Sequence, residues 1–188
     1  EAVSFLTHKQ VDGLINMPTD PTGAHLKPAL DAEIPIVLVD RMLKNLQGRV
    51  SAVVVDNVDA AEKGARYLTE LGHADIGLIL GNEGIYTSQL RCEGYLNICR
   101  EKGIHPRAEL IRYSDYTMEG GYQQMKALLA LPNKPTAVFV TNYEMTLGAI
   151  LALNEDGVNV PEDMSLLGFD KLDQFGVLYP ELTLVKQP

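Results

Sequence analysis

Short apolar runs alternate along this chain with amphipathic stretches, and the runs end at polar side chains. Four of them are IPIVLVDR (34–41), DIGLILGN (75–82), AVFVTN (137–142) and MSLLGFD (164–170). Strands that are apolar on both faces and alternate with helices of about 12–15 residues are typical of a parallel sheet covered on both sides. The pattern therefore predicts a doubly wound α/β fold.

The stretches between the runs have helical periodicity and helix-end signals. Residues 58–71 repeat apolar positions at helical spacing, and Gly72 follows where a left-handed residue commonly ends a helix. Further helices are expected from about 88 to 102, from an N-cap at Thr117 to a point before Pro132, and from about 145 to Gly157.

The polar residues at the strand exits are candidates for a ligand site. In open α/β sheets ligands bind outside the carboxyl ends of the strands, where Asp40, Asn142 and Asp170 are expected. Asp and Asn are also common helix caps and turn formers, and for any single residue this alternative is the stronger one. Arg41 directly follows Asp40 and weakens the capping alternative at this strand exit, because arginine is not a capping residue.

Composition and charge narrow the class of protein. The chain has 188 residues, 46% of them hydrophobic and 22% charged, which is typical of a globular protein. A net charge of −9 argues against non-specific binding of nucleic-acid backbones by this chain. No apolar run approaches the roughly 20 residues of a membrane helix, so no membrane partner is expected.

The two cysteines indicate a reducing compartment. Cys92 and Cys99 lie in one predicted helix, about two turns apart, which is too far for a disulfide. We expect free thiols and a cytoplasmic location.

Several segments together resemble a known family. They are VDGLI (11–15), IPIVLVDR, VVVDN with GARYLTELGHADIGLILG, LRCEGYLNICREKGI, the block TAVFVTNYEMTLGAILALNEDGVNVPEDMSLLGFD, and LTLVKQP. In order and spacing they resemble the effector-binding core of the lactose-repressor/galactose-repressor (LacI/GalR) family of bacterial transcription regulators. The resemblance implies a periplasmic-binding-protein-like type I fold, with two doubly wound parallel lobes and an effector in the cleft between them.

The resemblance also implies a division of the chain. Residues 1–56 would form part of the amino-terminal lobe, 57–186 the carboxyl-terminal lobe, and 187–188 the start of a return crossover, with Asp56 and Asn57 as hinge. A family member begins with a helix-turn-helix headpiece, so we expect this chain to be a fragment of a longer protein. An amino lobe of three strands would leave apolar surface uncovered, which is costly at roughly 25 cal/mol per Å².

Effector contacts in the carboxyl lobe follow from the matching positions. Asp170 would accept hydrogen bonds from effector hydroxyls or ring nitrogens. Arg91 would offer its five-donor fork to several oxygens, the alternative being a surface arginine on a helix. Asn142 would donate and accept through its amide. The family often has aspartate at the next position, which is Tyr143 here.

Other contacts are implied more weakly. Asp40 would reach the effector from the amino lobe, with Arg41 as an inter-lobe or structural partner. Tyr116 would place its ring against a sugar's C–H face, although core packing is an open alternative. Thr87 and Gln187 are candidates by position alone.

The sequence carries no sign of catalysis. It contains no G-x-S-x-G elbow, P-loop or G-x-G-x-x-G motif, so we expect no enzyme and no cofactor. The histidines and cysteines lack metal-ligand spacing, and no metal site is expected. His73 in the LGH turn is interpreted as a histidine that bonds nearby backbone.

The leading interpretation is a sensor domain for a sugar or sugar derivative. Effector binding would shift the lobes and so change how a missing helix-turn-helix headpiece, in a homodimer, binds operator DNA. A periplasmic sugar-binding protein of a transporter is the main alternative, and an α/β enzyme such as a sugar hydrolase or kinase is the third.

Overall fold

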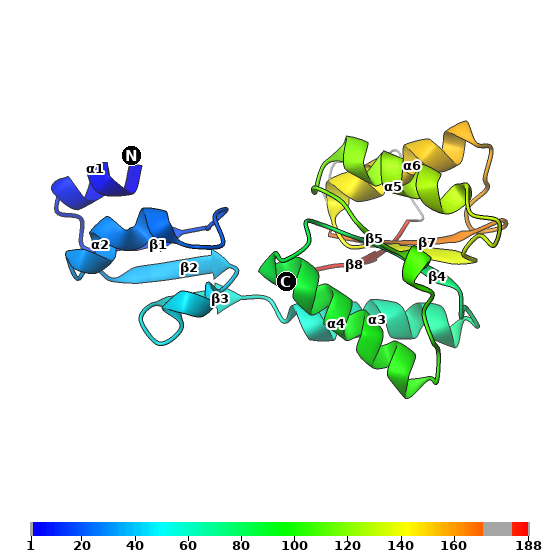
Figure 1. Cartoon of the computed structure of the whole chain (residues 1–188), viewed down its shortest axis with the longest axis horizontal. Helices are drawn as coiled ribbons and strands as arrows, with labels where there is room; N and C mark the ends of the chain where they lie inside the picture. Colours follow the sequence, from blue (N-terminus) through cyan, green and yellow to red (C-terminus); the bar gives the residue numbers. More distant parts are fainter. Residues whose placement is uncertain (1, 171–181, 188) are drawn as a thin grey trace. The chain divides into compact units, whose positions relative to one another are not determined.

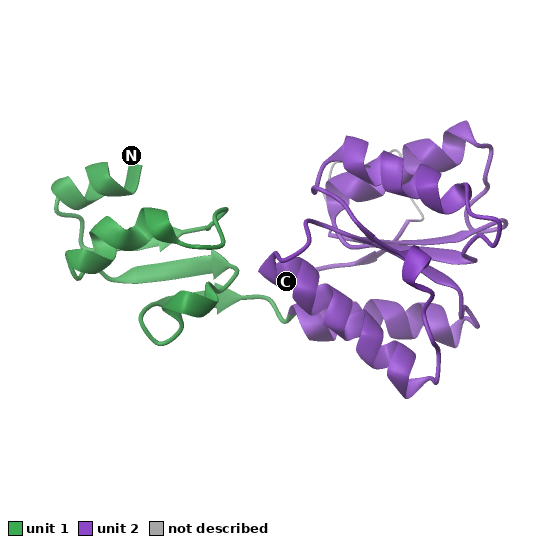
Figure 2. Ribbon diagram, in the orientation of Figure 1, with its two compact units in different colours: residues 1–56 green, residues 57–188 purple. Residues whose placement is uncertain are grey.

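The computed structural model describes residues 2–170 and 182–187, so Pro188, expected at the start of a crossover, lies outside the described residues. The chain divides into two compact units, residues 1–56 (unit 1) and 57–188 (unit 2) (Figure 2). Each unit has a parallel sheet of its own.

Unit 1 contains a small sheet with the order β1-β2-β3. Its strands are β1 (Leu14–Asn16), β2 (Ile36–Asp40) and β3 (Ser51–Val54), and its helices are α1 (Ala2–His8), η1 (Ala24–Leu26), α2 (Lys27–Asp31) and η2 (Lys44–Leu46). The buried core includes Leu26, Ala29 and Leu38. Ile15 and Val53 are 82% and 65% exposed, so apolar strand surface is uncovered in unit 1.

Unit 2 contains a sheet with the order β5-β4-β6-β7-β8, in which every neighbouring pair is parallel. Its strands are β4 (Ile76–Leu80), β5 (Ile111–Tyr113), β6 (Ala137–Val140), β7 (Ser165–Phe169) and β8 (Thr183–Val185). Its helices are α3 (Asn57–Glu70), α4 (Tyr86–Glu101), η3 (Ala108–Leu110), α5 (Met118–Leu129) and α6 (Tyr143–Glu155). Helices α3 and α4 cover one face of this sheet, and α5 and α6 cover the other (Figure 1).

The burial of strand β6 on both faces explains why its sequence is apolar throughout. Ala137 and Phe139 belong to the core cluster formed with α3 and α4, whereas Val138 and Val140 belong to the cluster formed with α5 and α6. A strand that is buried on both faces has no position for a polar side chain before its end. The predicted doubly wound α/β fold is confirmed.

The predicted helix ends are also found. Gly72 and Gly157 have φ of 95° and 66°, the left-handed conformation that ends helices α3 and α6. Thr117 is the N-cap of α5, and its hydroxyl accepts a hydrogen bond from the Gly120 amide at 2.9 Å. Helix α4 begins at Tyr86, two residues before the predicted start.

The strand order of unit 2 creates a reversal between β4 and β6. The chain passes from β4 to β5 on one side and then returns to β6 on the other side. The carboxyl ends of β4 and β6 are therefore the switch point at which open α/β sheets leave a crevice. Gly81 and Thr141 directly follow these two strand ends.

Candidate functional site

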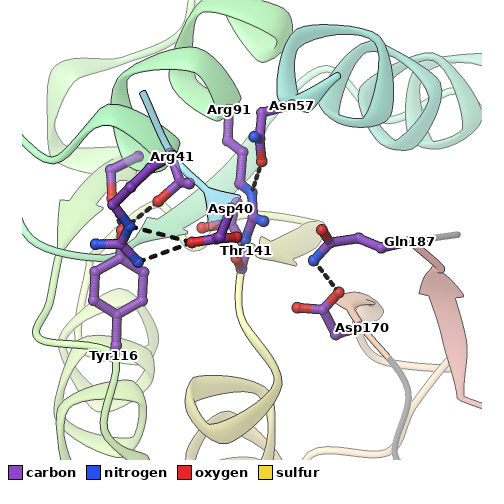
Figure 3. A network of polar contacts seen from close by, with 10 residues as sticks. Asp40, Arg41, Asn57, Arg91, Tyr116, Thr141, Asp170 and Gln187 are labelled. Carbon is purple, nitrogen blue, oxygen red and sulfur yellow. Dashed lines mark hydrogen bonds and ion pairs between the residues drawn. The ribbon is translucent and has the colours of Figure 1, made fainter. Parts of the chain in front are cut away.

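Arg91 lies at the switch point and is buried. It is 5% exposed, on the second turn of α4, and its Nε donates to Asn57 Oδ1 at 2.9 Å (Figure 3). Its Nη1 donates to the backbone carbonyl of Thr141, and its Cζ lies 3.8 Å from the centre of the Phe169 ring. The alternative of a surface arginine is wrong, because a charged group is buried here among polar and aromatic partners.

Thr141 is held in place by hydrogen bonds of its own, and this positions the backbone carbonyl that accepts from Arg91. The Thr141 amide and hydroxyl both donate to the Ile79 carbonyl at 2.9 Å, and Thr141 is 1% exposed. This residue extends the pairing of β6 with β4 by one step beyond the strand end. The guanidinium of Arg91 is therefore held at the carboxyl edge of the sheet.

Asn142 is the N-cap of α6. Its Oδ1 accepts a hydrogen bond from the Met145 amide at 3.1 Å, which is the capping role left open by the sequence. The side chain is half-buried and adjoins Thr141 in sequence. A contact with an effector stays a prediction for this residue.

Tyr116 is joined to the start of α4. Its hydroxyl lies 3.0 Å from Thr87 Oγ1 and 2.6 Å from Ser88 Oγ, and a Cβ at Gly81 would overlap its ring. Thr87 and Ser88 are 3% and 1% exposed. Ser88 is not among the predicted site residues, although its position beside Thr87 at a helix start is a usable signal.

The turn that carries Tyr116 is held by Asp115. The Thr117 amide and hydroxyl donate to Asp115 Oδ1 at 3.1 and 2.7 Å. These hydrogen bonds lower the pKa of Asp115, because they favour the carboxylate over the acid. Tyr116 also packs against the α5–α6 core cluster, so the core-packing alternative holds in part.

Asp170 and Gln187 form a pair beyond β7 and β8. Gln187 Nε2 donates to Asp170 Oδ1, and the Asp170 amide donates to the Val185 carbonyl at 2.8 Å (Figure 3). Both side chains are half-buried. Two residues singled out by the sequence are thus brought together at the same edge that carries Arg91.

Three of the predicted site residues have a left-handed backbone. The φ angles are 73° at Asp40, 65° at Tyr116 and 69° at Asp170. Aspartate tolerates this conformation, whereas a bulky tyrosine is strained in it. Strain of this kind concentrates at functional sites, which supports a candidate site at the turn of unit 2 that carries Tyr116.

Asp40 and Arg41 pair with each other in unit 1. Arg41 Nε and Nη2 donate to Asp40 Oδ2 at 3.2 and 3.0 Å, so Arg41 is a structural partner of this acid. Because Asp40 belongs to unit 1, its predicted convergence with the residues of unit 2 stays a prediction. Asp56 is exposed, and Asn57 is 1% exposed and bound to Arg91; their hinge role also stays a prediction.

The amide of His73 bonds nearby backbone, the Leu68 carbonyl at 3.2 Å, but its ring does not. Its Nδ1 lies 2.9 Å from Thr136 Oγ1, and its Nε2 lies 2.9 Å from Ser165 Oγ. Thr136 precedes β6 and Ser165 begins β7, so the ring links two strands at the amino edge of the sheet. The hydroxyl partners are 63 and 92 residues away, which a local interpretation of the turn could not find.

The remaining chemistry of the described residues is limited. Burial raises the pKa of the Cys92 and Cys99 thiols, which are free. Among residues 2–170 and 182–187, no group of three or more His, Cys, Asp or Glu side chains could hold a metal ion. No helix in that part of the chain combines the length and the apolar character needed to cross a bilayer.

Comparison with known proteins points to transcription regulators. Residues 65–188 match the periplasmic binding protein-like domain family. The "Probable HTH-type transcriptional repressor ExuR" of Bacillus subtilis is 34% identical over 97% of this chain and 55% of its own length. The HTH-type transcriptional repressor CytR of Escherichia coli is also 34% identical, over 99% of this chain and 54% of its own length. The chain thus spans about half the length of these curated relatives.

A solved structure agrees with this match. The sugar-binding transcriptional regulator of the LacI family from Escherichia coli, complexed with phosphate, has a TM-score of 0.86 and 28% identity. The alignment covers 100% of this chain and 67% of that one.

Proposed function

This chain belongs to the LacI/GalR family, as its effector-binding core, and from that premise we propose that it binds a sugar or sugar derivative within a longer transcriptional repressor. Effector binding regulates the DNA affinity of a helix-turn-helix headpiece, which acts as a homodimer in the cytoplasm. The palindromic operators of such dimers mirror their two-fold symmetry.

The observation that carries this proposal is the buried guanidinium of Arg91 at the switch point. Its Nε and Nη1 are directed by Asn57 and the Thr141 carbonyl, and Phe169 supports its flat face. An arginine oriented in this way offers donors in a fixed plane, which suits several oxygens of one small molecule.

Acceptors stand at the same edge of the sheet. The carboxylate of Asp170 accepts from Gln187 Nε2 in this structure, and a sugar hydroxyl would donate to the same carboxylate. Sugar hydroxyls both donate and accept, so they match an edge that supplies Arg91 donors and Asp170 acceptors. Asn142 and Thr87 add an amide and a hydroxyl.

Secondary roles follow for the other predicted residues. The ring of Tyr116 packs on a C–H face of the effector, and Gln187 exchanges its contact with Asp170 when the effector binds. Asp40 contributes from unit 1, and Asp56 and Asn57 act as hinge. The matched relatives are repressors rather than transport proteins or enzymes, so neither alternative function is favoured.

The test begins with a thermal-shift screen of the protein with D-ribose, D-galactose, D-glucuronate and cytidine. The compound with the largest shift is then titrated by calorimetry into the wild type and the Arg91→Ala and Asp170→Ala variants. We expect each variant to lose about 2–5 kcal/mol of binding free energy, because buried oxygens or donors of the effector become unpaired.

Arg100→Ala is the matched control, since Arg100 lies on the same helix but is exposed. It should bind with wild-type affinity. Unchanged affinity in Arg91→Ala or Asp170→Ala would refute the site, and the absence of a shift with all four compounds would refute the polyhydroxylated class.

A further inference from the structure

The partner of Arg91 stands at the boundary between the two units. Asn57 is the first residue of α3 and of unit 2, and Asp56 before it is the last residue of unit 1. Asn57 is 1% exposed, and its Oδ1 accepts the Nε–H of Arg91 at 2.9 Å. The charged donor makes this hydrogen bond stronger than one between neutral groups.

The guanidinium of Arg91 is held from three directions. Thr141 follows β6 and Phe169 ends β7, so two of the contacts come from the edge of the sheet. Asn57 supplies the third contact from a helix start next to the connecting chain. A planar group with two of its three nitrogens and one face engaged is restricted in orientation, and loss of the Asn57 contact weakens that restriction.

We propose that Asn57 is a positioning residue, which orients Arg91 for the effector and couples movement of that arginine to the chain segment joining the two units. The binding role of Arg91 rests on the proposed function above. A hydrogen-bonded pair can transmit only the free-energy difference between its two arrangements, so the strength of the Asn57–Arg91 bond sets the upper limit of this coupling.

The bond itself is tested without any effector. In ¹⁵N-labelled protein the Nε–H of Arg91 should give a slowly exchanging NMR signal, assigned by its absence in Arg91→Lys. We expect its hydrogen exchange to be about tenfold to a hundredfold faster in Asn57→Ala, since a hydrogen bond to a charged group is lost. Asn57→Asp keeps the acceptor oxygen and should restore slow exchange.

Asn57→Ser serves as a second variant should Asn57→Ala fail to fold, because serine is a good residue at a helix start but its side chain is too short to replace the amide oxygen. Fast exchange in Asn57→Ser with slow exchange in Asn57→Asp supports the positioning role. Wild-type exchange rates in either shortened variant would overturn it, as would fast exchange in Asn57→Asp.

The coupling to the connecting segment is tested by hydrogen–deuterium exchange of Arg91→Met. This variant keeps a long apolar side chain but cannot donate to Asn57. We expect faster amide exchange at residues 55–58 and no change in α5, which serves as the internal control. Unchanged exchange at 55–58, or an equal rise in α5, would overturn the coupling.

These measurements are independent of the compound screen. A failed screen would count against the proposed function and leave the Asn57–Arg91 bond intact. Conversely, unaltered exchange in Asn57→Ala and Asn57→Ser would overturn the positioning role and leave the affinity test of Arg91→Ala in force.

Discussion

The sheets of the two units are built from similar apolar strands but are covered differently. In unit 2 the side chains of Val138 and Phe139 point to opposite faces of the sheet, and both are fully buried. In unit 1 the buried Leu14 is followed by Ile15, which is 82% exposed. An apolar run therefore predicts a strand, but burial on both faces requires helices from two other parts of the chain.

The polar edges of the two sheets differ in a related way. In unit 1 Asp40 pairs with Arg41, its neighbour in sequence. In unit 2 Arg91 bonds residues 34 and 50 positions away. The edge of unit 2 is thus assembled from distant segments, and this is where a small molecule can be met by several groups at once.

The largest loss of unfolding free energy is expected for a substitution in the buried sheet of unit 2. Phe139→Ala removes a fully buried ring whose centre lies 6.3 Å from that of Phe169, and should cost about 3–5 kcal/mol of unfolding free energy. Ile15→Ala in unit 1 should change it by no more than about 0.5 kcal/mol, because the side chain is exposed. Urea unfolding followed by circular dichroism measures both.

A large loss of unfolding free energy in Ile15→Ala would contradict the comparison between the two sheets. It would mean that this face of the unit 1 sheet is covered in solution. A small loss at Phe139 would contradict the two-sided packing of unit 2.

A smaller loss of stability is expected for a substitution at the polar edge of the unit 2 sheet. Asn142→Ala removes the N-cap of α6 and should cost about 1 kcal/mol of stability, whereas Asn142→Asp should retain the cap. Asp163→Ala, which removes the acceptor of the Asn159 amide and side chain in the link before β7, is the control for binding, because that link lies at the amino edge of the sheet. Thermal melts measure stability, and calorimetry with the strongest compound of the screen measures binding.

Two results would contradict this account of Asn142. Wild-type stability of Asn142→Ala would exclude the cap. An equal loss of effector affinity in Asp163→Ala and Asn142→Ala would show that Asn142 acts through protein stability alone.

Much of the fold could be predicted from local patterns. Apolar runs marked the strands of unit 2, and Thr117 and Gly72 marked helix ends, because capping depends on residues close in sequence. The resemblance to a repressor core then singled out Arg91, Asp170 and Tyr116.

The contacts of these residues could not be predicted in the same way. The sequence assigned Asn57 to a hinge, and its bond to Arg91 spans 34 positions. The ring of His73 likewise bonds the hydroxyls of Thr136, just before β6, and Ser165, at the start of β7, instead of nearby backbone. Hydrogen bonds between side chains of different elements depend on how those elements pack, and periodicity carries no information about that.

The most direct test is to map, by ¹H–¹⁵N chemical shifts, where the strongest compound of the screen binds on the labelled protein. We expect the largest amide shifts at the carboxyl edge of the unit 2 sheet, at residues 81–91, 114–117, 141–142 and 170. Amides near His73, Thr136 and Ser165, at the amino edge of the same sheet, should not move. Shifts concentrated at the amino edge, with none near Arg91, would contradict the account.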